Sequence, residues 1–147
     1  MNKLYGITLA AVLVLVLCAG SAQAYELPYE EGTVWNITFI KTVEGMGELY
    51  LKELKALMIP ILDEAKKEGL ILSYRIFSSS AATPDDWDLM MMTEFKNFAA
   101  LDGIDQKFLD IYEKVAGADD DFEKGAAHRN EIRQILGDKM AREVILK

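Results

Sequence analysis

The chain is poor in the residues that build disulfides and most metal centres. It contains one cysteine, Cys18, and one histidine, His128. Cys18 lies in an N-terminal segment that we expect to be removed, so the remaining chain would have no disulfide, no thiolate nucleophile and no cysteine ligand for a metal. Its stability must then come from the burial of apolar side chains.

Charged residues are scarce at the N-terminus, and the residues there follow a recognisable order. Lys3 is the only charged residue among the first 25, an apolar run fills residues 7–18, and small residues lead up to Ala24. This order is typical of a cleavable signal peptide, which we place at residues 1–24. The apolar run is shorter than the roughly 20 residues of a membrane span, so an uncleaved anchor is less favoured. We therefore expect an exported protein, either periplasmic or secreted.

A lipid-anchored alternative for Cys18 is disfavoured, because Leu17 stands where a lipidation motif has a small residue. Cleavage after Ala24 would leave residues 25–147, which is the size of one domain. The whole chain has a net charge of −8, and loss of Lys3 makes it −9. Such a chain repels phosphate backbones and anionic lipid. We expect no nucleic-acid partner and no stable membrane association after cleavage.

The remaining chain alternates between strand and helix patterns, without a linker or an internal repeat. Runs of β-branched, aromatic and other apolar residues predict strands at 34–40, 70–77, 87–95 and 140–146. Apolar residues at helical spacing predict helices at 50–65, 97–116 and 119–136. Pro60 should kink the first helix, and Gly137 should end the last one.

This order, β-α-β-β-α-(α)-β, predicts an α+β protein of the ferredoxin-like plan, with a four-stranded antiparallel sheet and helices on one face. In that plan the first and third strands are central. Both are apolar on both sides: Trp35 alternates with Val34, and Met90 and Met92 flank Met91. The sheet face without helices is then too apolar to remain in water, so we expect it to be covered.

Three stretches carry a resemblance to a known superfamily: IKTVEGM at 40–46, KEGLILSYR at 67–75 and WDLMMMTEFKN at 87–97. In this order, around a long helix, they resemble the dimeric α+β barrel proteins. That superfamily includes NIPSNAP-like proteins, EthD-like proteins and antibiotic biosynthesis monooxygenases. The resemblance implies a homodimer whose sheets pack face to face, and a ligand cavity in each subunit between sheet and helices.

Some members of that superfamily degrade haem, using an Asn on the first strand together with a Trp and a His from the second helix region. Asn36 matches the first of these in type and position, but residues 97–115 contain neither Trp nor His. The resemblance therefore does not extend to haem, and we predict no cofactor. His128 has no second histidine or cysteine to support a metal site, so we predict no metal.

Polar and methionine side chains within the strands form the best candidate site. The predicted ligand-binding residues are Asn36, Arg75, Met90, Met92 and Glu94. Buried polar groups need partners, so Arg75 and Glu94 could pair in a cavity and orient a ligand carbonyl or carboxylate. Methionine adapts to irregular apolar ligands. The alternative is that the polar groups lie at strand ends in water or form a structural ion pair, and that the methionines are core.

The sequence thus favours an exported homodimer that binds a small apolar or aromatic molecule or serves in interactions. The alternative is a cofactor-independent oxygenase or isomerase acting on such a molecule, with acid and base groups around Asn36, Arg75 and Glu94. A roomy pocket with converging polar groups would distinguish ligand chemistry from a structural role.

Overall fold

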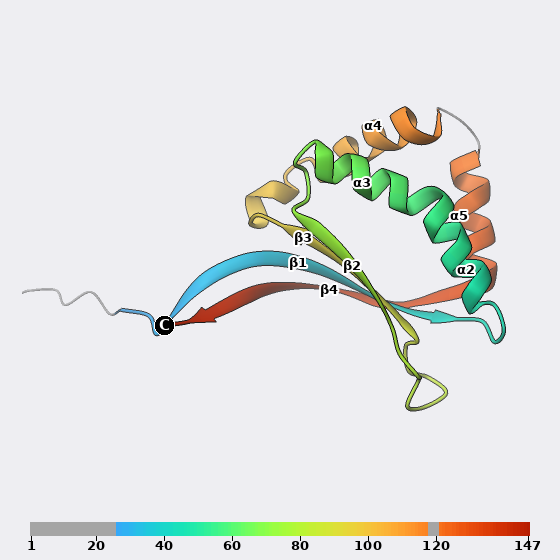
Figure 1. The fold of residues 1–147 in the computed structure, drawn as a ribbon, viewed down its shortest axis with the longest axis horizontal. Coiled ribbons are helices and arrows are strands. Elements are labelled where there is room, and N and C mark those ends of the chain that lie inside the picture. Colours follow the sequence, from blue (N-terminus) through green and yellow to red (C-terminus); the bar gives the residue numbers. More distant parts are fainter. Residues whose placement is uncertain (1–25, 118–120) are drawn as a thin grey trace, which may run out of the picture.

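The structure, a computed structural model, describes residues 26–117 and 121–147. The predicted signal peptide and the predicted start of the last helix at Asp119 lie outside these residues. Figure 1 shows one sheet with every labelled helix on the same side of it. Within the described ranges, no helix combines the length and hydrophobicity that a bilayer crossing requires.

The sheet has four antiparallel strands in the order β2-β3-β1-β4. The strands are β1 (Tyr29–Thr42), β2 (Ser73–Ser78), β3 (Leu89–Phe95) and β4 (Arg133–Leu146). The two strands that are apolar on both faces, β1 and β3, occupy the middle, as the sequence predicts. This order and the βαββαβ connectivity confirm the α+β ferredoxin-like fold.

The helical segments lie between these strands in the chain. They are α2 (Gly47–Glu53), the π-helical turn η1 (Leu54–Met58), α3 (Ile59–Lys67), the 3-10 turn η2 (Phe98–Leu101), α4 (Ile104–Ala116) and α5 (Asp121–Ile132). Gly117 ends α4 with a φ of 83°, a backbone conformation that favours glycine. The helices α3 and α4 pack together over one part of the sheet, whereas α2 and α5 meet over another (Figure 1).

The first helix is interrupted where the sequence predicts a kink. The backbone N–H of Ile59 donates to the carbonyl of Leu54, which is the wide i→i−5 bond of a π turn. Pro60 follows at once, in the first turn of α3. A proline has no N–H to donate and its ring crowds the carbonyl four residues earlier, so a widened turn before it relieves that crowding.

The boundary between the last helix and the last strand differs from the prediction. The predicted helix extends to Leu136 and ends at Gly137, but α5 ends at Ile132 and β4 already begins at Arg133. Gly137 therefore lies inside a strand, opposite Phe39 of β1. Ile132 and Leu136 are spaced as in a helix, but pairing with the long strand β1 makes residues 133–146 a strand instead. The pairing is irregular at Leu136, which forms a bulge as an unpaired extra residue.

The core between sheet and helices forms two clusters. The larger one lies under α3 and α4 and contains Val34, Ile61, Leu62, Ala65, Ile71, Phe95, Ile111 and Tyr112. The smaller one lies near α2 and α5 and contains Ile40, Tyr50, Leu54, Leu89 and Ile132. Met58 and Met91 pack against both clusters. Met91 thereby belongs to the helix side of the central strand β3.

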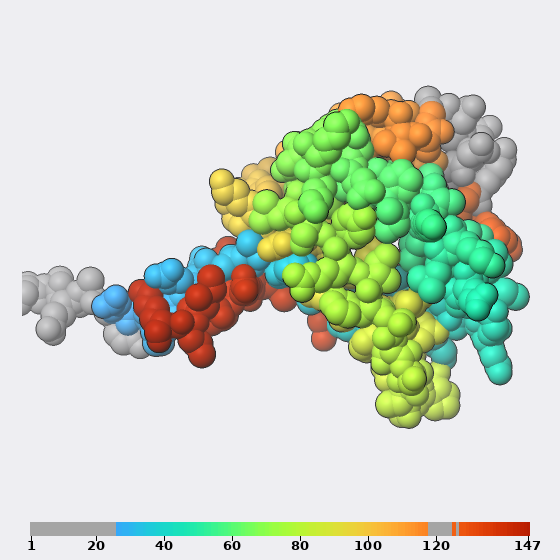
Figure 2. All heavy atoms as spheres, viewed as in Figure 1, coloured from blue at the N-terminus to red at the C-terminus, as the bar shows by residue number. Residues whose placement is uncertain are grey.

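The ends of β1 and β4 form a two-stranded arm that extends beyond the helices. In Figure 2 the start of β1 and the end of β4 project together from the body of the molecule. Val144 is 56% exposed and Leu146 is 79% exposed, while Arg142 contacts Glu31 at the base of the arm. A two-stranded ribbon is marginally stable in water. The arm therefore presents apolar surface that the described part of this chain does not cover.

Candidate functional site

The sheet face opposite the helices, which we call the open face, is a regular grid of side chains. Strand pairing places its residues in three rows: Ser73–Glu94–Trp35–Ala141, Arg75–Met92–Ile37–Lys139 and Phe77–Met90–Phe39–Gly137. The centre of the grid is apolar, and Phe77 at its edge is 41% exposed. The predicted residues Met90 and Met92 lie here rather than in the core, so they are available to a partner or a ligand.

Two cations of the open face lie over aromatic rings. The guanidinium carbon of Arg75 is 5.5 Å from the ring centre of Trp35, and Nζ of Lys139 is 5.7 Å from that of Phe39. Both distances allow cation–π attraction. These contacts hold long, basic side chains flat against the apolar grid.

The predicted ion pair between Arg75 and Glu94 is not formed in the described structure. Glu94 instead accepts hydrogen bonds from the hydroxyls of Ser73, at 2.5 Å, and Thr33, at 2.9 Å. The Thr33 hydroxyl also lies 3.4 Å from a carboxylate oxygen of Glu143 on β4. Two acids thus gather at the end of the open face, and the described residues place no cation within ion-pair distance of either.

Asn36 lies on the other side of the sheet. Residues alternate along a strand, and Asn36 is opposite Thr93 and Met140, which face the helices. Beside it, the hydroxyl of Thr38 donates to Asp138 at 2.5 Å. The structure therefore brings four of the five predicted residues to one face and separates Asn36 from them by the thickness of the sheet.

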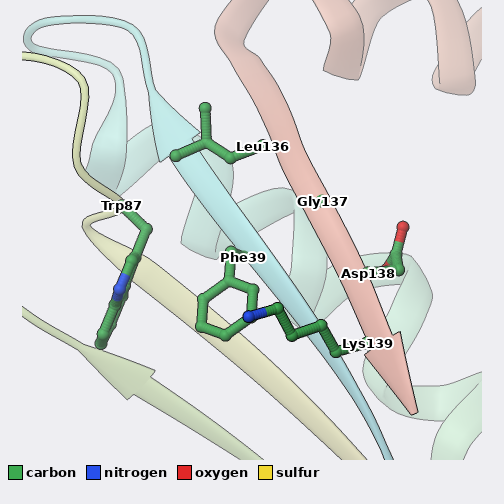
Figure 3. Close-up of a pocket in the computed structure, with 6 residues that line it drawn as sticks. All are labelled: Phe39, Trp87, Leu136, Gly137, Asp138 and Lys139. Carbon is green, nitrogen blue, oxygen red and sulfur yellow. The ribbon is translucent and has the colours of Figure 1, made fainter.

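A hollow beside the edge strand β4, on the open face, has an aromatic wall (Figure 3). This aromatic hollow, of about 340 Å³, is lined by Phe39, Trp87, Leu136, Gly137, Asp138 and Lys139. The rings of Phe39 and Trp87 are 5.9 Å apart and inclined by 58°. In Figure 3 Lys139 reaches across Phe39, whereas the carboxylate of Asp138 points away from both rings. The hollow thus combines two aromatic rings with one amine.

Sequence reasoning missed the residues of this hollow because they depend on the bulge in β4. Leu136 is the extra residue where Phe39 pairs with Gly137 and Ile40 pairs with Ile135. The bulge turns Leu136 towards Phe39 and Trp87, and Gly137 adds no side chain to fill the space. The one usable signal was a glycine inside an apolar stretch, which marks a bulge in a strand as well as the end of a helix.

His128 lies between carboxylates of two helices. Its Nε2 lies 3.0 Å from Glu53 of α2, and its Nδ1 lies 3.4 Å from Glu131 of α5. Among residues 26–117 and 121–147, no group of three or more His, Cys, Asp or Glu side chains is placed to hold a metal ion.

Comparisons with known proteins give structural neighbours alone. No protein-family model matches the sequence, and no curated protein matches it at a significant level. Two dimeric ferredoxin-like proteins from an uncultured marine organism superpose on it. One has a TM-score of 0.47 and 16% identity over 80% of this chain and 90% of that one. The other has a TM-score of 0.48 and 13% identity over 80% of this chain and 98% of that one.

A third neighbour is a conserved protein of unknown function from Bacteroides thetaiotaomicron, described as a possible oxidoreductase. It superposes with a TM-score of 0.43 and 17% identity, over 79% of this chain and all of that one. At these values the similarity supports no assignment of activity. The fold assignment rests on the strand order and connectivity described above.

Proposed function

We propose that this protein is an exported homodimer that binds a small aromatic or apolar molecule in the aromatic hollow. The observation that supports binding is the combination of Phe39, Trp87 and Lys139 around one cavity. Ligand sites are concave and mostly apolar, with a few polar groups that fix orientation. Two inclined rings suit an aromatic ligand, and the amine of Lys139 suits a carboxylate or phenolate on it.

The open face is the feature that supports a homodimer. Its central side chains, Trp35, Ile37 and Met92, would be solvated in an isolated subunit. Leaving apolar surface in water costs about 25 cal/mol for each Å², and a typical interface buries about 800 Å² on each partner. A second copy is the simplest cover, because a two-fold axis applies the same patch to itself.

The charges on the open face also suit a second copy. Its middle row carries Arg75 and Lys139 at the two ends, while Glu94 and Glu143 lie at one end of the grid. A two-fold related copy can place its acids opposite these bases. The exposed arm would extend the same interface, because its apolar residues project beyond the helices of their own subunit (Figure 2).

The alternative, a cofactor-independent oxygenase or isomerase, loses its proposed site. It relied on Asn36, Arg75 and Glu94 acting together, but the sheet separates Asn36 from the other two. Acid–base catalysis needs its groups within hydrogen-bond reach of one substrate. We therefore propose binding in the aromatic hollow as the function of this face.

Binding in the hollow predicts a saturable change in the fluorescence of Trp87. With Trp35→Phe as background, so that Trp87 is the sole reporter, titration with 2-naphthoate should quench or shift the emission. Lys139→Met should lower the affinity for 2-naphthoate about tenfold or more, because a hydrogen bond to a charged group contributes about 1.5–3 kcal/mol. Binding of 2-naphthol, which lacks the carboxylate, should change much less.

Lys107→Met on α4 is the matched control, since it removes the same charge from the helix side of the sheet, opposite the open face (Figure 1). It should leave the affinity for 2-naphthoate unchanged. An emission that does not saturate, or equal losses for the two lysine variants, would contradict binding at the hollow.

Export predicts a processed N-terminus. Expressed in a bacterial host with its full sequence, the protein should be recovered outside the cytoplasm and begin at Tyr25, because small residues precede Ala24 at the expected cleavage point. N-terminal sequencing checks this. A chain that retains Met1, or one that begins at a lipidated Cys18, would refute the processing we expect.

A further inference from the structure

Two arginines at the α5–β4 junction, Arg129 and Arg133, place positive charge near the buried Tyr50. Arg129 is 7% exposed and Tyr50 is 1% exposed. The guanidinium carbon of Arg133 lies 5.3 Å from the centre of the Tyr50 ring. Burial raises the pKa of Tyr50, and the neighbouring charges of Arg133 and Arg129 oppose that rise. Both guanidinium groups therefore act on the same buried phenol.

Among the residues whose side chains the structure describes, no carboxylate lies within ion-pair distance of Arg129 or Arg133. Nε of each is buried and has no hydrogen-bond partner among them. The nearby acids Glu53 and Glu131 contact His128 instead. A phenol with a raised pKa stays neutral near pH 7 and cannot serve as a counter-ion. Buried charge of one sign is costly unless something compensates it.

A second hollow adjoins this cluster and gives it access to solvent. This corner hollow, of about 280 Å³, is lined by Lys41, Thr42, Val43, Glu44, Asn130, Arg133 and Gln134. Arg133 thus belongs both to the buried cluster and to the wall of the hollow. Side-chain amides from Asn130 and Gln134 add neutral donors. Lys41 and Glu44 also line the hollow, but the amine of Lys41 already donates to the carbonyl of Pro84.

We propose that the corner hollow binds a small oxyanion of the phosphate, sulfate or carboxylate class. The planar fork of Arg133 matches two oxygens of such an anion, and Asn130 can donate a further hydrogen bond. Arg129 acts on the same tyrosine through its charge and adds positive potential. This site lies at the end of the sheet between β1, α5 and β4, so it is separate from the aromatic hollow of the open face.

Calorimetric titration with inorganic phosphate tests the proposal, on protein lacking residues 1–24 and at constant ionic strength set by chloride. Saturable binding should be seen, and Arg133→Gln should weaken it at least tenfold. Lys107→Gln, which removes one positive charge from α4, should leave it unchanged. Repeating the titration with sulfate and with acetate distinguishes a tetrahedral anion from a carboxylate.

Arg133 contacts a buried residue, so its loss could also harm folding. Asn130→Asp avoids this difficulty, because Asn130 is exposed and the change adds a negative charge at the hollow. Asn130→Asp should lower the affinity for phosphate at least tenfold, while its circular dichroism spectrum stays that of the wild type. An absence of saturable binding by all three anions, or equal affinity in wild-type protein and Asn130→Asp, would overturn the proposal.

Discussion

Met91→Lys is expected to unfold the subunit. Met91 lies on the central strand β3, faces the helices and packs against both core clusters. A lysine there would bring an ammonium group among apolar side chains without a partner, which destabilises by about 4 kcal/mol or more. A domain of this size is stable by only about 5–15 kcal/mol in total. Thermal melts followed by circular dichroism should show a large fall in melting temperature or no cooperative transition.

Met90→Lys is the matched control, because it makes the same chemical change one residue earlier on the same strand. Met90 lies on the open face, in the row with Phe77 and Phe39. Its lysine can reach water in an isolated subunit, so the variant should keep the secondary structure of the wild type. If Met90→Lys unfolds the protein and Met91→Lys does not, the two faces of β3 have been assigned the wrong way round.

The protein without residues 1–24 is expected to sediment as a dimer at micromolar concentration, and Ile37→Lys should make it a monomer. Ile37 lies at the centre of the open face, in a row that already ends in Arg75 and Lys139. A third cation in that row would meet like charge and apolar surface across the interface. Such contacts cost several kcal/mol, so the dissociation constant should rise about 100-fold or more.

Leu109→Lys provides the control for the dimer. Leu109 is 44% exposed on α4, on the helix side of the sheet, so a lysine there should leave sedimentation unchanged. A wild-type protein that stays monomeric at micromolar concentration would refute the dimer. Dissociation of Ile37→Lys and Leu109→Lys alike would show that the interface is not the open face.

The two hollows and the proposed dimer can be tested separately. Loss of the dimer in Ile37→Lys does not bear on phosphate binding, because the corner hollow involves neither Ile37 nor its row. The aromatic hollow borders the open face through Phe39, so its ligand and the dimer could influence one another. Titrating 2-naphthoate into Ile37→Lys measures that coupling directly.

The sequence by itself determined the fold class and the two faces of the central strands. Alternation fixes which side chains share a face, whatever the register, so Met91 separates from Met90 and Met92, and Val34 from Trp35. The order of strand and helix patterns then selects the ferredoxin-like plan from few alternatives. Alternation alone did not show whether Asn36 and Arg75 share a sheet face, because it does not relate the faces of one strand to those of another.

Tertiary structure alone decided where α5 ends and where the hollows form. Spacing at Ile132 and Leu136 fits a helix as well as it fits an irregular strand, and pairing with β1 selects the strand. The resulting bulge brings Leu136, Phe39 and Trp87 around one cavity from three distant parts of the chain. Cross-strand register likewise paired Glu94 with hydroxyls and placed Arg75 over Trp35. Register depends on contacts between distant segments, which a local pattern does not encode.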